Sequence, residues 1–238
     1  MKTMLRLDKF LSDMGIGSRN EVKKYLKSGR VSVNNKVIKA PECKVNVNDD
    51  EIVFDGRRIT YQLYEYFMLN KPAGVVSATT DNVHDTVIES ITSSVKKDLF
   101  PVGRLDIDTE GLLIITNDGD LAHKLLSPKK HVPKTYYAKI EGRVCSEDVE
   151  VFKKGIKLED DFTTLPAELK IITSDAVSEI EVTIYEGKFH QVKRMFQSVG
   201  KKVVYLKRLS VGPLVLDPDL AVGGYRPLSD DEVNLLRQ

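Results

Sequence analysis

Long apolar stretches are absent from this sequence of 238 residues. No run approaches the roughly eighteen consecutive apolar residues of a membrane-spanning helix, and residues 1–9 lack the apolar core of a secretory signal. Cysteine is scarce, because Cys43 and Cys145 stand far apart and suggest neither a disulfide framework nor a metal cluster. From these absences we expect a cytoplasmic protein that contacts no membrane.

The sequence also lacks metal-ligand spacing. Its histidines show no paired arrangement: His84, His123, His131 and His190. Residues 106–111 begin like a calcium-binding loop, with acidic residues at alternate positions and then a glycine. Such a loop needs a bidentate Glu at its twelfth position and a helix on each side, but the twelfth residue here is Asn117, after a strand-like run. We therefore expect no metal site.

Charge is unevenly distributed along the chain. The net charge is +1, yet residues 1–44 contain eleven Lys and Arg against four Asp and Glu. The rest of the chain is therefore mildly acidic in total. A small basic segment on a larger body is typical of a polyanion-binding module joined to a second domain. A basic surface that is merely solvated is the alternative.

The basic segment has the pattern of a small folded unit. Apolar residues at helical spacing predict a helix over 7–14, and a capping box at 18–21 predicts the start of a second helix. Alternating residues on both sides of Asn34-Asn35 predict a hairpin over 31–38. Two more short strands are expected over 45–59. This unit would end near residue 60.

The run from Gly103 to Gly119 is the most informative stretch of the second part. It begins with a charged loop that contains Arg104 and Asp106, and the apolar residues 112–115 that follow predict a buried strand. In a cleft, a carboxylate held ionised by a cation could act as a nucleophile or a base. A solvated turn is the alternative, because Asp, Thr and Gly are ordinary turn residues.

Strands and helices are expected on both sides of this run. Periodicity and capping residues predict strands over 64–69, 134–139 and 178–184, and helices over 83–91, 121–126, 146–154, 192–199 and 229–236. Two segments are locally basic. Residues 123–139 contain five Lys and two His without an acid, and residues 188–208 contain seven Lys and Arg without an acid. Such segments are typical of the rim of an RNA-binding site.

The run Gly103–Gly119 resembles the signature of the RsuA-like pseudouridine synthases over seventeen consecutive residues. Three further segments are similar to motifs of that family: Asn70-Lys71-Pro72-Ala73-Gly74, Lys134-Thr135-Tyr136 and Glu186-Gly187-Lys188-Phe189-His190-Gln191-Val192-Lys193-Arg194-Met195-Phe196. The N-terminal pattern resembles the S4 RNA-binding domain over residues 4 to about 50. Together these resemblances cover nearly the whole chain, and they imply an enzyme that isomerises uridine in RNA to pseudouridine without a cofactor.

The resemblance also implies roles for individual residues. Asp106 would be the catalytic carboxylate, with Arg194, and also Arg104, as its counter-charge. Whether Asp106 attacks C1′, attacks C6 or removes the C2′ proton stays open. Tyr136 would stack on the base, and Tyr137 would then face the other side of the strand. RNA contacts would come from a set of basic residues: Lys9, Arg19, Lys23, Lys27, Arg30, Lys71, Lys134, Lys188 and Lys193.

The implied fold is α+β. A small S4-type RNA-binding domain of residues 1–60 would precede a catalytic domain of residues 61–238, with a long, mainly antiparallel sheet and a central cleft. Residues 127–136 and 225–228 are most similar to the family members that modify small-subunit ribosomal RNA. We expect a monomer that acts on this RNA in an assembling particle with ribosomal proteins. The alternatives are a large-subunit RNA target and a noncatalytic RNA-binding assembly factor.

Overall fold

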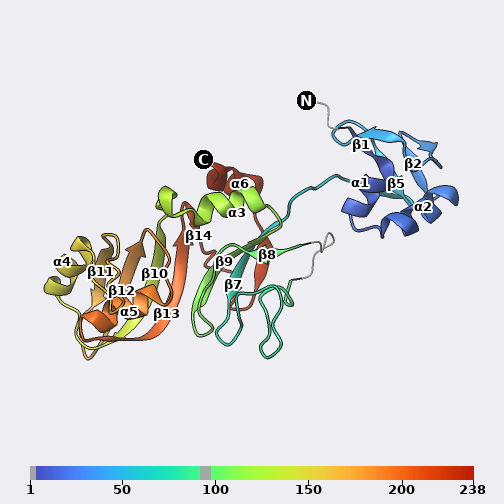
Figure 1. The fold of residues 1–238 in the computed structure, drawn as a ribbon. Helices are drawn as coiled ribbons and strands as arrows, with labels where there is room; N and C mark the ends of the chain where they lie inside the picture. The colour runs from blue at the N-terminus through green and yellow to red at the C-terminus, as the bar shows by residue number, and fades with distance from the viewer. Residues whose placement is uncertain (1–3, 92–97) are drawn as a thin grey trace. The chain divides into compact units, whose positions relative to one another are not determined.

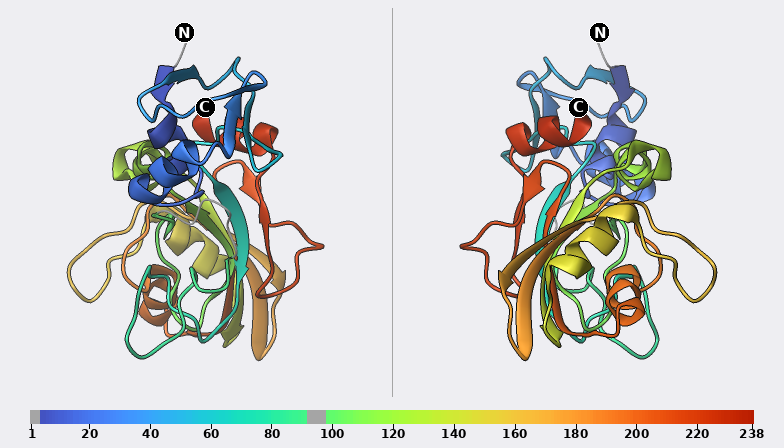
Figure 2. Two further views of the ribbon diagram at one scale, coloured as in Figure 1. Left: turned by 90° about the vertical axis from the view of Figure 1, so that its right-hand side faces the viewer. Right: turned by 90° about the vertical axis from the view of Figure 1, so that its left-hand side faces the viewer.

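The computed structural model describes residues 4–91 and 98–238. Within that part the chain divides into two compact units (Figures 1 and 2). The first runs up to Glu65, and the second contains Tyr66–Ile91 and Leu99–Gln238. The division lies a few residues after the position near 60 that we expect from the sequence. None of the described helices is long and apolar enough to span a lipid bilayer.

The first unit contains two helices and short strands. Its elements in chain order are β1 (Met4–Arg6), α1 (Leu7–Asp13), α2 (Arg19–Lys27), β2 (Val31–Val33), β3 (Lys36–Val37), β4 (Lys44–Asn46), β5 (Ile52–Phe54) and β6 (Arg57–Ile59). The strands pair in the order β3-β2-β5-β6, and β1 pairs separately with β4. The predicted order of helix, helix and hairpin is therefore confirmed.

Local chemistry explains the main boundaries of this unit. The Ser18 side chain accepts a hydrogen bond from the Glu21 N–H, and the Glu21 carboxylate accepts one from the Ser18 N–H, which is the predicted capping box of α2. Asn34 and Asn35 both have positive φ, as a two-residue hairpin turn requires. The apolar faces of α1 and α2 pack against the strands in one core that contains Phe10, Leu26 and Val31.

The second unit is built on one large sheet. Its elements are β7 (Tyr66–Lys71), β8 (Phe100–Pro101), β9 (Glu110–Thr116), α3 (Gly119–Leu126), a 3₁₀ turn (Pro128–Lys130), β10 (Lys134–Glu141), α4 (Ser146–Lys154), β11 (Glu168–Thr173), β12 (Val177–Ile184), α5 (Gln191–Ser198), β13 (Lys202–Val211), β14 (Leu214–Val215), β15 (Tyr225–Pro227) and α6 (Asp230–Arg237).

The sheet is mainly antiparallel, as predicted. Its main path is β11-β12-β10-β13-β9-β7-β15, with β14 beside β13 and β8 beside β9. One pair is parallel: β13 runs alongside β9, with Arg208 opposite Gly111. This parallel junction joins the strand that follows the charged loop to the strand that follows α5.

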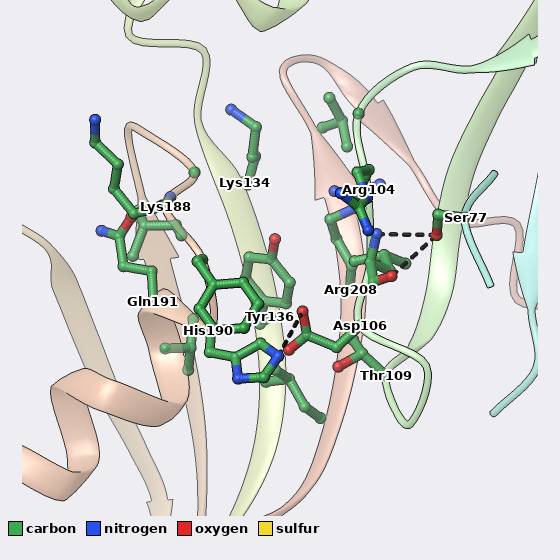
Figure 3. A pocket seen from close by; sticks show the side chains of 18 of the residues that line it. Ser77, Arg104, Asp106, Thr109, Lys134, Tyr136, Lys188, His190, Gln191 and Arg208 are labelled. Carbon is green, nitrogen blue, oxygen red and sulfur yellow. Dashed lines mark hydrogen bonds and ion pairs between the residues drawn. The ribbon is translucent and has the colours of Figure 1, made fainter. Parts of the chain in front are cut away.

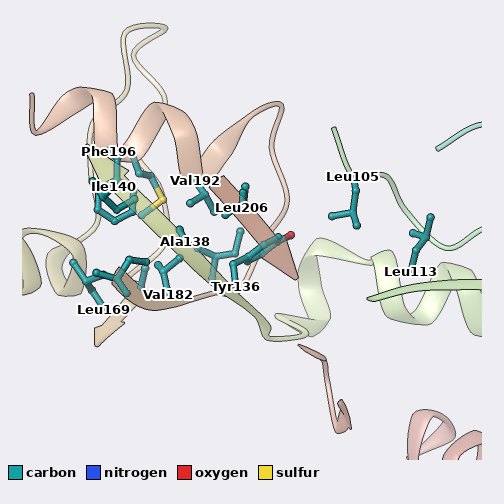
Figure 4. Packing of buried hydrophobic residues seen from close by; sticks show 14 of the residues in the cluster. Leu105, Leu113, Tyr136, Ala138, Ile140, Leu169, Val182, Val192, Phe196 and Leu206 are labelled. Carbon is teal, nitrogen blue, oxygen red and sulfur yellow. The ribbon is translucent and has the colours of Figure 1, made fainter. Parts of the chain in front are cut away.

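Both faces of the sheet are covered, which explains the unbroken apolar run in β9. Leu113 and Ile115 contribute to a core on the face that α4 and α5 cover, and Leu112 and Ile114 contribute to a second core with α3 and α6. Figure 4 shows the first of these cores, with Phe196 packed over the strands. Consecutive strand residues point to opposite faces, so a strand buried on both sides has no polar positions.

One predicted helix is not formed. Residues 83–91 contain turns, and Thr86 makes an isolated bridge with Val76. The N–H of Val76 donates to the carbonyl of Asp85, and the N–H of Val87 donates to the carbonyl of Val76. These tertiary backbone bonds take the place of helical ones, while Val87 and Ile91 are buried in the core.

Gly111 is a position where the close approach of two strands requires glycine. Its φ is +101°, and a Cβ built on it would lie 2.3 Å from the carbonyl oxygen of Arg208. Gly74 has a similar φ of +86°, but a Cβ there would meet nothing within 4 Å. A side chain at either position would be strained by the positive φ. Only at Gly111 would it also clash with the neighbouring strand.

We predict that Gly111→Ala destabilises the second unit by about 2 kcal/mol more than Gly74→Ala, since overpacking adds to the strain of positive φ. Calorimetric unfolding of the full chain would measure both variants against the wild type. Equal shifts for the two variants would contradict the close-approach explanation.

Candidate active site

A cavity of about 610 Å³ lies in the second unit, and four parts of the chain form most of its lining. These parts are the loop 102–109 before β9, the start of β10, residues 187–193 around the start of α5, and the face of β13. Figure 3 shows the labelled side chains from these elements meeting around one space. Asp106 is the carboxylate among the described residues that line it.

Asp106 is held between two basic side chains from the segment that begins α5. Its Oδ2 lies 3.1 Å from Lys193 Nζ, and its Oδ1 lies 3.7 Å from His190 Nε2. Lys193 Nζ also donates to Asp108 Oδ1 at 2.6 Å. Burial tends to lower the pKa of Lys193, but the two carboxylates raise it overall. The ammonium therefore stays protonated beside Asp106 and compensates its negative charge.

The prediction that Arg194 is the counter-charge of Asp106 is wrong in this structure. Arg194 pairs with Asp160, at 2.5 Å between Nη2 and Oδ1, and it is not among the residues that line the cavity. The reason is the phase of α5, which buries Val192 and Phe196. Neighbouring helical residues point about 100° apart, so Lys193 faces the cavity while Arg194 faces the loop that carries Asp160.

The segment before α5 sets that phase. His190 is the N-cap with a left-handed conformation, φ 49°. The side-chain oxygen of Gln191 accepts a hydrogen bond from the Lys188 N–H at 2.9 Å, and its amide donates to Glu186. Gln191 is buried, so these bonds hold the turn from inside. They bring the ring of His190 toward Asp106 (Figure 3).

The prediction that Lys71 contacts RNA is also wrong in this structure. Its side chain is 0% exposed, and its ammonium donates to the carbonyl oxygens of Pro72 and Thr109 at 2.9 Å and of Asp106 at 3.2 Å. The carbonyl of Ile107 lies 3.4 Å away. A buried lysine thus supports the backbone of the loop that carries the carboxylate.

The loop has a second support in Ser77. The Ser77 hydroxyl oxygen accepts from the Leu105 N–H at 3.0 Å, and the hydroxyl donates to the Leu105 carbonyl at 3.0 Å (Figure 3). Ser77 therefore holds the backbone of the residue before Asp106, and Lys71 holds the backbone of Asp106 and of the residues after it. Neither role could be read from the sequence, where Lys71 belongs to a motif of unknown orientation and Ser77 to none.

The two tyrosines of β10 face opposite sides of the sheet. Tyr136 is 8% exposed and lines the cavity. Tyr137 makes an edge contact with the ring of Tyr205, at 6.0 Å between centroids, and the Tyr205 hydroxyl donates to Glu110 at 2.6 Å. This is the orientation that strand alternation and the Lys-x-Tyr pattern predict.

Other predicted basic residues lie around the cavity. Arg104, Lys134 and Lys188 line it together with Lys193. Arg208 on β13 also lines it, although the sequence indicated that residue only as part of the basic segment 188–208. The described residues contain no group of three or more His, Cys, Asp and Glu side chains arranged to hold a metal ion.

Most of the predicted RNA-binding residues of the first unit are exposed: Lys9, Arg19, Lys23 and Lys27. Arg30 is engaged within the unit, because its guanidinium pairs with Asp55 and lies over the rings of Tyr25 and Phe54. The contact of each of these residues with RNA stays a prediction.

Lys71 gives a pH-dependent prediction for stability. Burial lowers the pKa of Lys71 to about 8, although nearby carboxylates, first among them Asp108, oppose the shift. Between pH 8 and the unfolded pKa of about 10.4, the unfolded state therefore binds more protons than the folded state. Through Lys71, the free energy of unfolding therefore rises as the pH increases from 8 to about 10.4, and it falls again as the pH decreases toward 8.

We expect the free energy of unfolding of the wild type to rise relative to Lys71→Met by up to about 1.4 kcal/mol per pH unit between pH 8 and 10. Urea unfolding at several pH values would measure the difference, in which other titrating groups cancel. Parallel curves for the two proteins would show that Lys71 does not titrate in this window.

Comparisons with known proteins agree with this geometry. The model of the RNA pseudouridylate synthase family matches residues 65–198, and that of the S4 domain matches residues 5–50. A protein of Bacillus subtilis named uncharacterized RNA pseudouridine synthase YtzG is 46% identical over 98% of this chain and 99% of its own length. The ribosomal small subunit pseudouridine synthase A of Escherichia coli K12 is 39% identical over 96% of this chain and 98% of its own.

Solved structures support the same assignment. A crystal structure of a pseudouridylate synthase superposes with a TM-score of 0.68 at 36% sequence identity, covering 98% of this chain and 99% of that one. The S4-type fold of the first unit and the mainly antiparallel sheet of the second therefore have one explanation. The chain belongs to the RsuA-like family of RNA pseudouridine synthases.

Proposed function

We propose that this RNA pseudouridine synthase converts one specific uridine of small-subunit (16S) ribosomal RNA to pseudouridine, with the Asp106 carboxylate as its catalytic group and no cofactor. The observation that carries the catalytic part is the position of Asp106. Its carboxylate, 26% exposed, lies in a cavity between Lys193 and His190 with Tyr136 on the wall.

The reaction places defined demands on such a site. The bond between N1 of uracil and C1′ of ribose breaks, the base turns, and a bond between C5 and C1′ forms. The C5 proton is then lost, and N1 ends protonated, so no atom is added or removed. A carboxylate beside the sugar can act as nucleophile or base in the first step, and we assign that role to Asp106.

Lys193 would keep this carboxylate reactive. A positive charge within about 4 Å favours the ionised form of an acid. Lys193 meets this condition while also pairing with Asp108. Asp108 in turn holds the lysine in place, so the pair forms a fixed counter-charge rather than a mobile surface lysine.

Tyr136 provides the surface on which a base could stack. Its ring is nearly buried in the wall of the cavity, next to apolar residues such as Leu206. A uridine inside folded RNA must leave its stack before it can reach Asp106. The phenol could then also accept or pass on the C5 proton.

The target RNA is proposed from the relatives and the charge of the chain. The Escherichia coli relative is named for the small ribosomal subunit, and the basic S4-type unit would give salt-dependent binding to RNA phosphates. We propose that the enzyme works as a monomer in the cytoplasm, on an assembling particle that includes ribosomal proteins.

The central prediction concerns Asp106→Asn, which keeps the shape of the side chain and removes its charge. We expect the rate of pseudouridine formation in 16S RNA to fall at least about 10³-fold, as for loss of an essential nucleophile or base. Binding to the RNA should change little. Carbodiimide labelling with primer extension would map the product on RNA alone and on RNA with early assembly proteins bound.

Three outcomes would count against the proposal. Pseudouridine that appears in 23S but not 16S RNA would move the target to the large subunit. Equal binding by both proteins with no pseudouridine from either would favour an assembly factor without catalysis. A rate for the Asp106→Asn variant equal to that of the wild type would remove the carboxylate from the mechanism.

Lys193 and Arg194 provide a matched pair of variants. Lys193→Met removes the cation beside Asp106, and we expect it to lower kcat about 10²-fold, the usual effect of losing one electrostatic contact in an active site. Arg194→Met removes an adjacent cation that pairs with Asp160, and its kcat should stay within about threefold of the wild type. A larger loss in Arg194→Met than in Lys193→Met would restore the arginine as counter-charge.

A further inference from the structure

Arg208 carries a free donor in the wall of the cavity. Its side chain is 3% exposed, and its Nε donates to the carbonyl of Leu112 at 2.7 Å. Its Nη2 is buried and has no hydrogen-bond partner among the described residues, although Arg208 lines the cavity. A buried donor without a partner costs free energy, and more so when it is charged. Because Nη2 itself has almost no exposed surface, a ligand in the cavity would supply the missing acceptor once the guanidinium turns toward it.

The sheet register places this donor next to the proposed stacking surface. Arg208 is opposite Tyr136 on β10 and opposite Gly111 on β9. Directly opposed residues of neighbouring strands share a face of the sheet. The guanidinium therefore lies on the same side of the sheet as Tyr136, as Figure 3 shows. Through Nε it binds β9, the strand that follows the Asp106 loop.

Lys134 is the second cation of this wall. It is half-buried, lines the cavity, and its Nζ donates to the carbonyl of Val132 at 2.9 Å. Burial, with the charge of Arg208, lowers the pKa of Lys134 to about 8. Two cations that repel each other in a partly dry wall form a site that an anion would stabilise.

The balance of charge in the cavity supports the same ligand. Among the described lining residues there are five cations, Arg104, Lys134, Lys188, Lys193 and Arg208, and a single carboxylate, Asp106. Asp106 and Asp108 neutralise Lys193. The excess of positive charge is thus on the other four cations, which include Lys134 and Arg208.

We propose that Arg208 and Lys134 form a subsite for a phosphate of the RNA backbone next to the uridine that reacts. The guanidinium is planar and suits the geometry of phosphate oxygens, and Lys134 adds a second charge. A carbonyl of uracil would satisfy the free donor but would not balance two cations. This subsite rests on the pseudouridine synthase activity and adds a contact that positions the nucleotide.

Single neutral linkages in the RNA test the proposal. RNA fragments that contain the mapped uridine would be joined by ligation, each with one methylphosphonate in place of a phosphate within two nucleotides of that uridine. Single-turnover rates of pseudouridine formation would be compared with those of unmodified RNA. We expect one linkage to slow the wild type about 10- to 100-fold, the effect of losing a charge-assisted hydrogen bond.

The methylphosphonate that slows the wild type should have little further effect on the rate in variants that lack part of the subsite. In Lys134→Met, and in Arg208→Lys if it folds, the methylphosphonate should add less than about threefold to the loss that the variant itself causes. Lys129→Met is the matched control, since Lys129 is exposed in the same basic loop and does not line the cavity. This control should keep the wild-type sensitivity. Circular dichroism and urea unfolding would show that each variant is folded.

Several results would overturn the proposal. If the wild type modifies unmodified RNA but tolerates every methylphosphonate equally, the subsite is absent while the activity stands. The same conclusion follows if Lys134→Met keeps the full linkage effect. Inorganic phosphate that binds the wild type by calorimetry, with no linkage effect in RNA, would assign the site to a free anion. No pseudouridine in any RNA would refute both the activity and the subsite.

Discussion

The buried ammonium of Lys71 is the interaction on which the site depends. Three carbonyl oxygens of the loop around Asp106 and one from Pro72 surround it. A lysine with no exposed surface is costly unless its donors are used, and here each donor fixes backbone rather than a side chain. The loop can therefore project Asp106 into a cavity and still keep one conformation.

The ion pairs of the cavity involve two acids that are close in sequence and one lysine that is distant in sequence. Asp106 and Asp108 come from one loop, and Lys193 comes from the start of α5, so the ion pairs connect two distant segments. The buried face of α5 fixes the rotation of the helix, and the rotation selects Lys193 over Arg194. Packing of apolar residues thus determines which cation serves the carboxylate.

The sequence predicted local features well because their causes are local. The capping box at Ser18 and the turn at Asn34-Asn35 involve residues within a few positions of each other. The family resemblance selected Asp106 and Tyr136, which both line the cavity, because it compares whole motifs. The predictions for residues 83–91 failed where tertiary backbone bonds to Val76 replaced helical ones.

Roles that depend on distant partners were beyond the sequence. Whether Lys71 points to solvent or under a loop is decided by contacts 35 and 38 positions away. The choice between Lys193 and Arg194 depends on helical phase and on Asp160. Arg208 lies 96 positions from Leu112, whose carbonyl it binds. Only the parallel pairing of β9 with β13 brings these two residues together.

That parallel pairing also connects binding with catalysis. The absence of a side chain at Gly111 lets β13 approach β9, and Arg208 is then bound through Nε to the strand that carries the Asp106 loop. A phosphate held at Nη2 would fix the ribose relative to the same strand that fixes the carboxylate. Binding free energy from the RNA backbone could then be used to orient C1′ against Asp106, which raises the rate rather than the affinity alone.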